Sequence, residues 1–72
     1  MRAAAVIELV QQYLPQAIQA SSATVCLRDA QQLLVGGDER YALQRALKAL
    51  AYCVGVLHPA YAAATAPSTT GA

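Results

Sequence analysis

Side chains that could carry out chemistry are few in this sequence, and none of them stands at a recognisable catalytic or metal-binding spacing. The two cysteines, Cys26 and Cys53, have neither a CxxC nor a histidine-rich spacing, so a zinc site is not predicted. In the helical hairpin predicted below they are offset by about five residues, roughly 8 Å of helix, which is too far for a disulfide. We therefore interpret both as reduced, buried thiols.

The remaining polar candidates do not combine into a catalytic site. His58 is the only histidine and lies near the end of a predicted helix, which favours a capping or interface role over catalysis. Asp29 and Asp38 are not placed as an acid–base pair, and Gly36-Gly37 lacks the strand and the Lys-Ser/Thr pair of a phosphate-binding loop. The sequence therefore predicts no enzyme activity, no cofactor and no metal site.

Composition instead points to association with another protein. The chain has 72 residues, a formal net charge of +1 and 57% hydrophobic residues. The near-neutral charge predicts no general attraction to nucleic acid or to acidic membranes. The longest apolar run, Ala49 to Leu57, is about half of what spans a bilayer, so we expect a cytoplasmic protein with no stable membrane insertion. A chain this short has a small core, and its apolar excess indicates a protein partner or self-association.

The elements that position these residues are organised around the turn Gly36-Gly37-Asp38. Glycine accepts the left-handed backbone that ends a helix, and Asp38 can cap the first turn of the next helix. A helix that stops and another that starts within three residues must run antiparallel. The predicted fold is all-α: an antiparallel helical hairpin of Gln16–Val35 and Asp38–His58, with a short N-terminal helix or helix extension over Met1–Leu14. We expect residues 1–64 to form one domain and residues 65–72 to be a disordered tail.

Large apolar residues in the second arm recur at alternating spacings of four and three, which is typical of a coiled-coil seam. This predicted seam consists of Leu43, Leu47, Leu50, Val54, Leu57 and Tyr61. Counting outward from the turn, Leu27 is expected at the level of Leu47, and Ala23 at the level of Leu50. Small residues on one arm would then meet large ones on the other, so that the helices approach closely.

The apolar arc of the second arm is wider than one facing helix can cover. Beside the seam lies a flank of small and medium residues: Ala42, Ala46, Ala49, Cys53, Val56 and Ala60. Two explanations are open. The segment Met1–Leu14 could fold back over this flank and complete a three-helix bundle, or a partner chain or second copy could cover it. The second explanation is preferred, and it predicts a partner-binding surface composed of Ala49, Cys53, Val56, Ala60 and Leu33.

The stretch from residue 36 to residue 58 resembles a known family. The turn, then Gln44-Arg45, then Lys48-Ala49-Leu50 and an aliphatic run that closes on His58 are similar to the small E-type co-chaperones of type III secretion needle subunits, the YscE, PscE and SsaE group. The resemblance implies a hairpin scaffold that binds a tetratricopeptide-type chaperone. Together the pair would keep the needle subunit monomeric and soluble in the cytoplasm before export.

A different class of function is also compatible with the pattern. Two copies of a self-associating hairpin would form a dimeric four-helix bundle with a structural or regulatory role. A weaker likeness to archaeal hairpin proteins of unknown function, carried by Asp29-Ala30, Gly37-Asp38 and Ala42-Leu43, fits this alternative.

Overall fold

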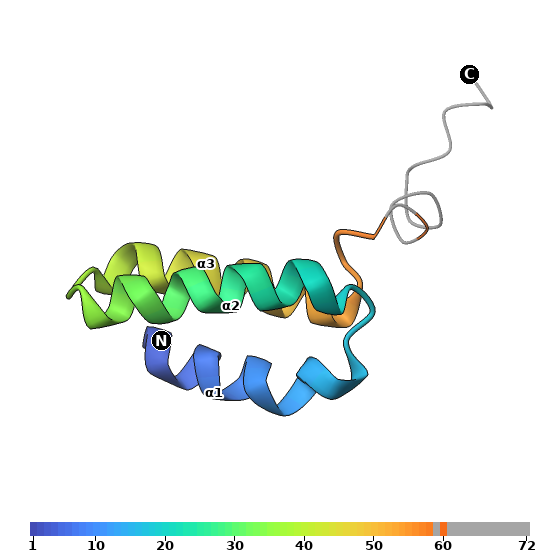
Figure 1. Cartoon of the computed structure of the whole chain (residues 1–72), viewed down its shortest axis with the longest axis horizontal. Helices are drawn as coiled ribbons and strands as arrows, with labels where there is room; N and C mark the ends of the chain where they lie inside the picture. Colours follow the sequence, from blue (N-terminus) through green and yellow to red (C-terminus); the bar gives the residue numbers. More distant parts are fainter. Residues whose placement is uncertain (59, 61–72) are drawn as a thin grey trace, which may run out of the picture.

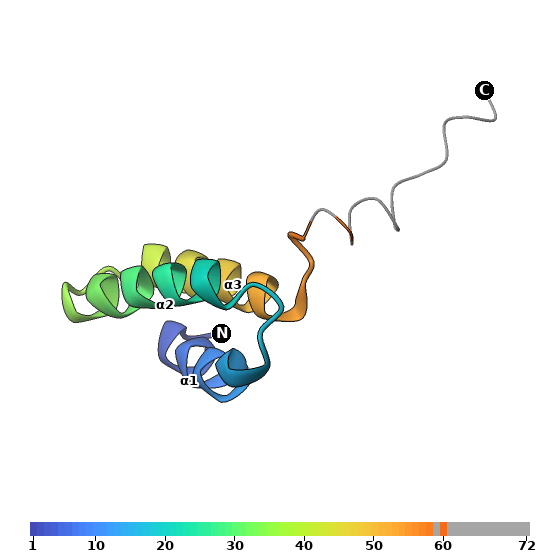
Figure 2. The same cartoon turned by 45° about the vertical axis from the view of Figure 1, so that its right-hand side comes forward.

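A computed structural model describes residues 1–58 and 60, which form an all-helical fold (Figure 1). Helix α1 spans Ala3–Tyr13, a short 3-10 turn covers Leu14–Gln16, α2 spans Ala20–Val35 and α3 spans Glu39–Val54. Helices α2 and α3 form the predicted antiparallel hairpin. Helix α1 runs back along this hairpin, antiparallel to α2 and parallel to α3 (Figures 1 and 2). The all-α hairpin with a short N-terminal helix is confirmed.

The turn between α2 and α3 follows the predicted stop-and-start chemistry. Gly37 has a left-handed backbone, with φ of 85°. Its N–H donates to the Leu34 carbonyl at 3.0 Å, and the Asp38 N–H donates to the Leu33 carbonyl at 2.9 Å, the paired bonds of a Schellman motif. Asp38 Oδ1 then accepts from the Tyr41 N–H at 3.2 Å and caps α3. Gly36 keeps a right-handed helical backbone, so Gly37 alone supplies the left-handed residue.

The second arm is shorter than predicted, because a glycine ends α3 before His58. Gly55 has φ of 82° and is the C-cap of a helix whose last residue is Val54. The Val56 N–H donates to the Ala51 carbonyl at 3.0 Å, which closes a second Schellman motif. The predicted bound at His58 is therefore wrong. The left-handed Gly55 stops the helix before Pro59 can.

The first arm also begins later than Gln16. Pro15 lies in the 3-10 turn, and Ala17 adopts an extended backbone with ψ of 137°. The two residues before α2 turn their backbone donors toward the end of α3: Ile18 N–H donates to the Cys53 carbonyl at 3.1 Å, and Gln19 N–H to the Tyr52 carbonyl at 3.3 Å. Carbonyls in the last turn of a helix lack partners within it. Ile18 and Gln19 supply these missing donors and hold the start of α2 against the end of α3.

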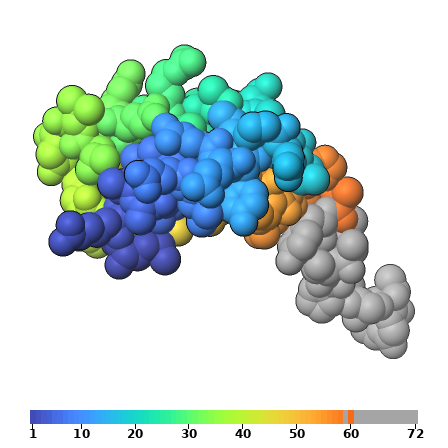
Figure 3. Space-filling model, turned by 90° about the horizontal axis from the view of Figure 1, so that it is seen from below, coloured from blue at the N-terminus to red at the C-terminus, as the bar shows by residue number. Residues whose placement is uncertain are grey.

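Helix α1 covers the flank that the sequence assigned to a partner. Figure 3 shows α1 lying across α2 and α3. The hydrophobic core joins one face of each helix: Val6, Ile7 and Val10 from α1, Ala23, Cys26, Leu27 and Ala30 from α2, and Ala46, Ala49 and Cys53 from α3. Among residues 1–58 and 60, Val10 is the largest side chain that is fully buried. Because the core side chains of α3 are small, α1 and α2 can both approach α3 closely. The fold-back of residues 1–14, the less favoured of the two explanations, is what the structure shows.

One charged contact joins α1 to the start of α3. Glu39 Oε2 accepts from the Ala3 N–H at 2.7 Å, although the two residues are far apart in sequence. Helix α1 has no side-chain cap of its own. Glu39 therefore caps the first turn of α1 from another helix. It also lies at the N-terminus of α3, where a negative charge is favourable. The predicted seam residue Tyr61 and the predicted tail, residues 65–72, lie outside the described part of the chain.

Candidate protein-binding surface

Helix α3 has one side toward α1 and another toward α2, and two polar contacts identify them. Glu39 reaches α1 through Ala3, whereas Arg45 Nε lies 3.9 Å from Asp29 Oδ2 on α2. The Arg45–Asp29 pair joins positions that the predicted register places at the same level. Both side chains are nearly half exposed, so this ion pair adds little stability. The Arg45–Asp29 pair identifies the side of α3 that faces α2.

The large aliphatic residues of α3 lie toward the α1 side of the helix. Leu43, Leu47, Leu50 and Val54 fall within about 60° of one another at 100° per residue. Leu50 lies about 20° around the axis from Glu39, whereas Leu50 and Arg45 are about 140° apart. We call these four residues the apolar stripe. The predicted seam is wrong for Leu47 and Val54, which are exposed, and the small residues Ala46, Ala49 and Cys53 occupy the interior instead.

The two stripe residues nearest α1 are more buried than the other two. Leu43 and Leu50 are partly buried and pack against the core. Leu47 is 41% exposed and Val54 is 54% exposed. Beyond the end of α3, Val56 and Leu57 are also exposed. A folded chain of this size thus leaves a row of aliphatic side chains in solvent at regular helical spacing. Such a face is typical of a surface that packs against another helix.

The predicted partner-binding residues do not lie together. Ala49 is fully buried and Cys53 is 4% exposed, both in the core beneath α1. Their assignment to a partner surface is wrong, because the chain's own first helix covers them. Val56 and Ala60 are exposed but follow Gly55, past the end of α3. Leu33 is partly buried and lies beside Asp29 and Arg45, between α2 and α3. Of the three residues outside the core, Val56 lies nearest in sequence to the apolar stripe, two residues after Val54.

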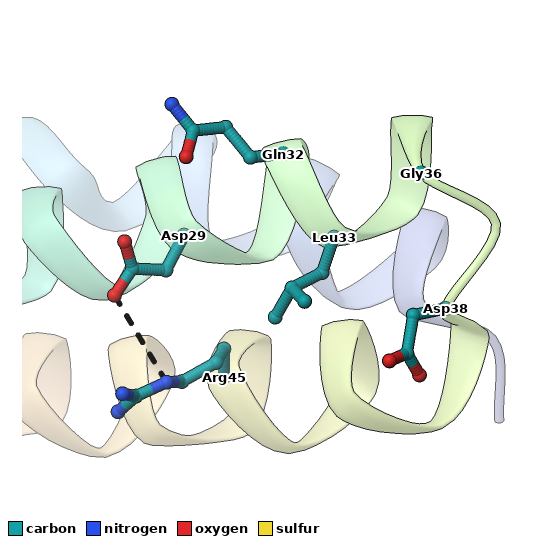
Figure 4. A pocket seen from close by; sticks show the side chains of 6 residues that line it. All are labelled: Asp29, Gln32, Leu33, Gly36, Asp38 and Arg45. Atoms are coloured by element: carbon teal, nitrogen blue, oxygen red, sulfur yellow. Dashed lines mark ion pairs between the residues drawn. The ribbon is translucent and has the colours of Figure 1, made fainter.

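Leu33 belongs to a separate hollow between α2 and α3, shown in Figure 4. It has a volume of about 500 Å³ and is lined by Asp29, Gln32, Leu33, Gly36, Asp38 and Arg45. In this view Asp29 and Arg45 point toward one another across it, and Gln32 points away from α3. Asp38 is already engaged as the cap of α3. The lining holds no histidine, cysteine or hydroxyl side chain, so it offers no nucleophile paired with a base.

The thiols are structural in this arrangement. Cys26 and Cys53 are both free and buried. Burial raises the pKa of the Cys53 thiol, which disfavours the reactive thiolate. His58 Nδ1 accepts from the Ala60 N–H at 3.0 Å, a local contact after the helix end. Among residues 1–58 and 60, no group of three or more His, Cys, Asp or Glu side chains could hold a metal ion.

Sequence reasoning missed two features of this surface. Gly55 was overlooked as a helix stop, although a glycine four residues before Pro59 in an apolar run is itself a C-cap signal. The outward position of Leu47 and Val54 had no sequence signal, since their spacing is also that of an interior seam. No helix in the described part of the chain is long and apolar enough to cross a bilayer. Comparison with family models, with curated proteins and with solved structures found no match.

Proposed function

We propose that this chain is a non-enzymatic protein-binding module whose partner packs along the apolar stripe of α3. The observation that carries the proposal is the exposure of Leu47 and Val54 in the folded monomer. Burying such side chains against a partner contributes roughly 25 cal/mol per Å² of apolar surface. The reactive side chains support the same conclusion, because the thiols are buried and the hollow beside Leu33 has no nucleophile–base pair.

Within this class, we propose a co-chaperone of a type III secretion system. The support is the resemblance of residues 36–58 to the E-type co-chaperones, together with a helical hairpin of suitable length. In this role the chain pairs in the cytoplasm with a tetratricopeptide-type chaperone and keeps the needle subunit soluble and unpolymerised. The partner-binding residues are revised accordingly: Leu47, Val54 and Val56 replace Ala49 and Cys53 at the centre of the interface.

Co-expression tests this role. The chain is produced together with the tetratricopeptide-type chaperone and needle subunit encoded in the same genome, and the complex is isolated through a tag on the chain. We expect a soluble complex with a monomeric needle subunit. Leu47→Asp should abolish the complex, because it buries an unpaired carboxylate in the interface. Val25→Asp is the matched control, because it makes the same kind of change at a valine of α2 that is 58% exposed, and it should leave the complex intact. A complex that survives Leu47→Asp would contradict the proposed surface.

The exposed stripe also supports a second candidate, self-association of two copies; because the described part of each copy has three helices, the dimer would have six rather than the four expected for two hairpins. Two copies could bury the same Leu47 and Val54 side chains against one another. Sedimentation equilibrium of the purified chain distinguishes this candidate. A dimer that Leu47→Asp converts to a folded monomer supports self-association, and a monomer at all concentrations excludes it.

A further inference from the structure

The apolar stripe has a border of one charge sign. After Glu39, every charged residue of α3 is basic: Arg40, Arg45 and Lys48. Arg45 faces α2 and pairs with Asp29. Arg40 and Lys48 are exposed and belong to the outward side of the helix. Arg40 lies about 20° from Leu47 around the axis of α3, near one end of the stripe. Lys48 lies about 100° from Leu47, on the solvent-facing edge of the stripe.

No acidic side chain of α3 neutralises these two cations. The chain has four acidic residues in total. Asp29 pairs with Arg45, Asp38 caps α3, and Glu39 accepts from the Ala3 N–H. The fourth, Glu8, lies on α1. A helix laid along the stripe would therefore meet basic groups along its edge, and Lys and Arg can bury their aliphatic stems there while the charged ends remain in water.

We infer that the partner segment is an amphipathic α-helix with acidic residues beside its apolar face. This inference rests on the proposed function and adds the chemistry of the partner. Because α1 occupies one side of the stripe, the incoming helix approaches from the direction of Leu47. Lys48 then takes the flanking position that charged residues hold in coiled coils. Glu or Asp at the edge of the incoming helix meets Arg40 and Lys48, and this complementarity selects the partner and speeds its association.

The same charges argue against a second copy as the occupant. In a two-fold antiparallel pairing centred between Leu47 and Leu50, the Lys48 side chains of both copies come to the same level of the interface. Like charges placed opposite one another are destabilising. An anionic membrane surface is also disfavoured. Stable membrane binding by a surface helix needs a strongly basic face and deep apolar burial, whereas this face has two free cations and half-buried leucines.

Two synthetic peptides and charge-reversal variants test the inference. Both peptides carry leucine at the same helical spacing; one has glutamate at the flanking positions and the other has lysine. Binding to the full chain is measured by fluorescence anisotropy at low and high salt. We expect the glutamate peptide to bind at least about tenfold more tightly, with the difference shrinking at high salt. Lys48→Glu and Arg40→Glu should each weaken binding of the glutamate peptide about fivefold, and the double variant should reverse the preference.

Arg28→Glu is the matched control, because it makes the same charge change on exposed α2 surface. Equal binding of both peptides, no binding of the glutamate peptide, or an equal effect of Arg28→Glu and Lys48→Glu would overturn the inference. If the natural complex is lost with Leu47→Asp but is unaffected by Lys48→Glu, the protein-binding role stands and the acidic partner does not. A Leu47-dependent dimer, or binding to vesicles of anionic phospholipid that exceeds binding of the glutamate peptide, would replace the acidic helix with those occupants.

Discussion

At the scale of single residues, the two glycines of the turn have different roles despite being adjacent. Gly37 has a left-handed backbone, and a Cβ placed on it would meet nothing within 4 Å. Gly36 is right-handed, and its Cβ would make ordinary contacts of 3.5 Å with two helix carbonyls. We therefore expect Gly37→Ala to lower the free energy of unfolding by about 1 kcal/mol through backbone strain alone.

Gly36→Ala is the matched control for this prediction. It should be neutral or slightly stabilising, because alanine restricts the unfolded chain and fits the native backbone. Urea unfolding of both variants, followed by circular dichroism, gives the comparison. Equal losses at the two positions would contradict the assignment of the left-handed residue to Gly37.

Gly55 combines a left-handed backbone with a close neighbour. A Cβ at this position would lie 3.2 Å from Ile18 Cγ1, closer than ordinary contact. Gly55→Ala should therefore destabilise the chain by more than Gly37→Ala, because steric strain is added to backbone strain. Shortening the neighbour should remove only the steric part. We expect the double variant Gly55→Ala with Ile18→Ala to show an interaction free energy of at least about 0.5 kcal/mol in a double-mutant cycle. Strict additivity would show that Ile18 can move aside freely.

At the scale of elements, Glu39 links α1 to the hairpin. It supplies the only side-chain cap seen at the start of α1 in the described part of the chain, and it does so from another helix. Glu39→Ala should release the first turn of α1 at a cost of about 1 kcal/mol, the usual effect of losing an N-cap. Native-state hydrogen exchange should show faster exchange in α1 and little change in the middle of α2.

Asp38→Ala provides a contrast for this experiment, since it removes the cap of α3 instead. Its effect should concentrate in the first turn of α3. If both variants accelerate exchange uniformly over all three helices, α1 does not open separately from the hairpin.

The helical elements follow from the sequence because their end signals are local. Gly37 and Asp38 define the turn through backbone conformation and capping, which depend on neighbouring residues only. The position of the apolar stripe is not local. The spacing of Leu43, Leu47 and Leu50 indicates an apolar face without indicating which neighbour covers it. The size of the side chains decides which face of α3 is buried. Where the three helices meet there is room for Ala46 and Ala49 but not for leucines, so the larger side chains lie at the edge of the core.

At the scale of the whole molecule, the core is small and built from modest side chains. Val10 is its largest fully buried residue, and α3 contributes only alanines and a cysteine to the core cluster. A domain of this length has little stability to spare. Each helix therefore depends on the other two, and we expect α1 to be needed for the hairpin to fold. The leucines left at the margin are available to a partner without dismantling that core.

Ala49 and Val56 test this arrangement directly, because helical spacing groups them on one flank whereas the structure separates them. Ala49 is fully buried beneath α1, and Val56 is 43% exposed past the end of α3. Ala49→Asp places a carboxylate in the core without a counter-charge, a cost of several kcal/mol, and should unfold the isolated chain. Val56→Asp leaves the carboxylate in water and should keep the helical content and the unfolding midpoint nearly unchanged. Thermal unfolding by circular dichroism gives both results. If Val56→Asp also melts the monomer, the segment after Gly55 packs into the core; if Ala49→Asp is tolerated, α1 does not cover the flank in solution.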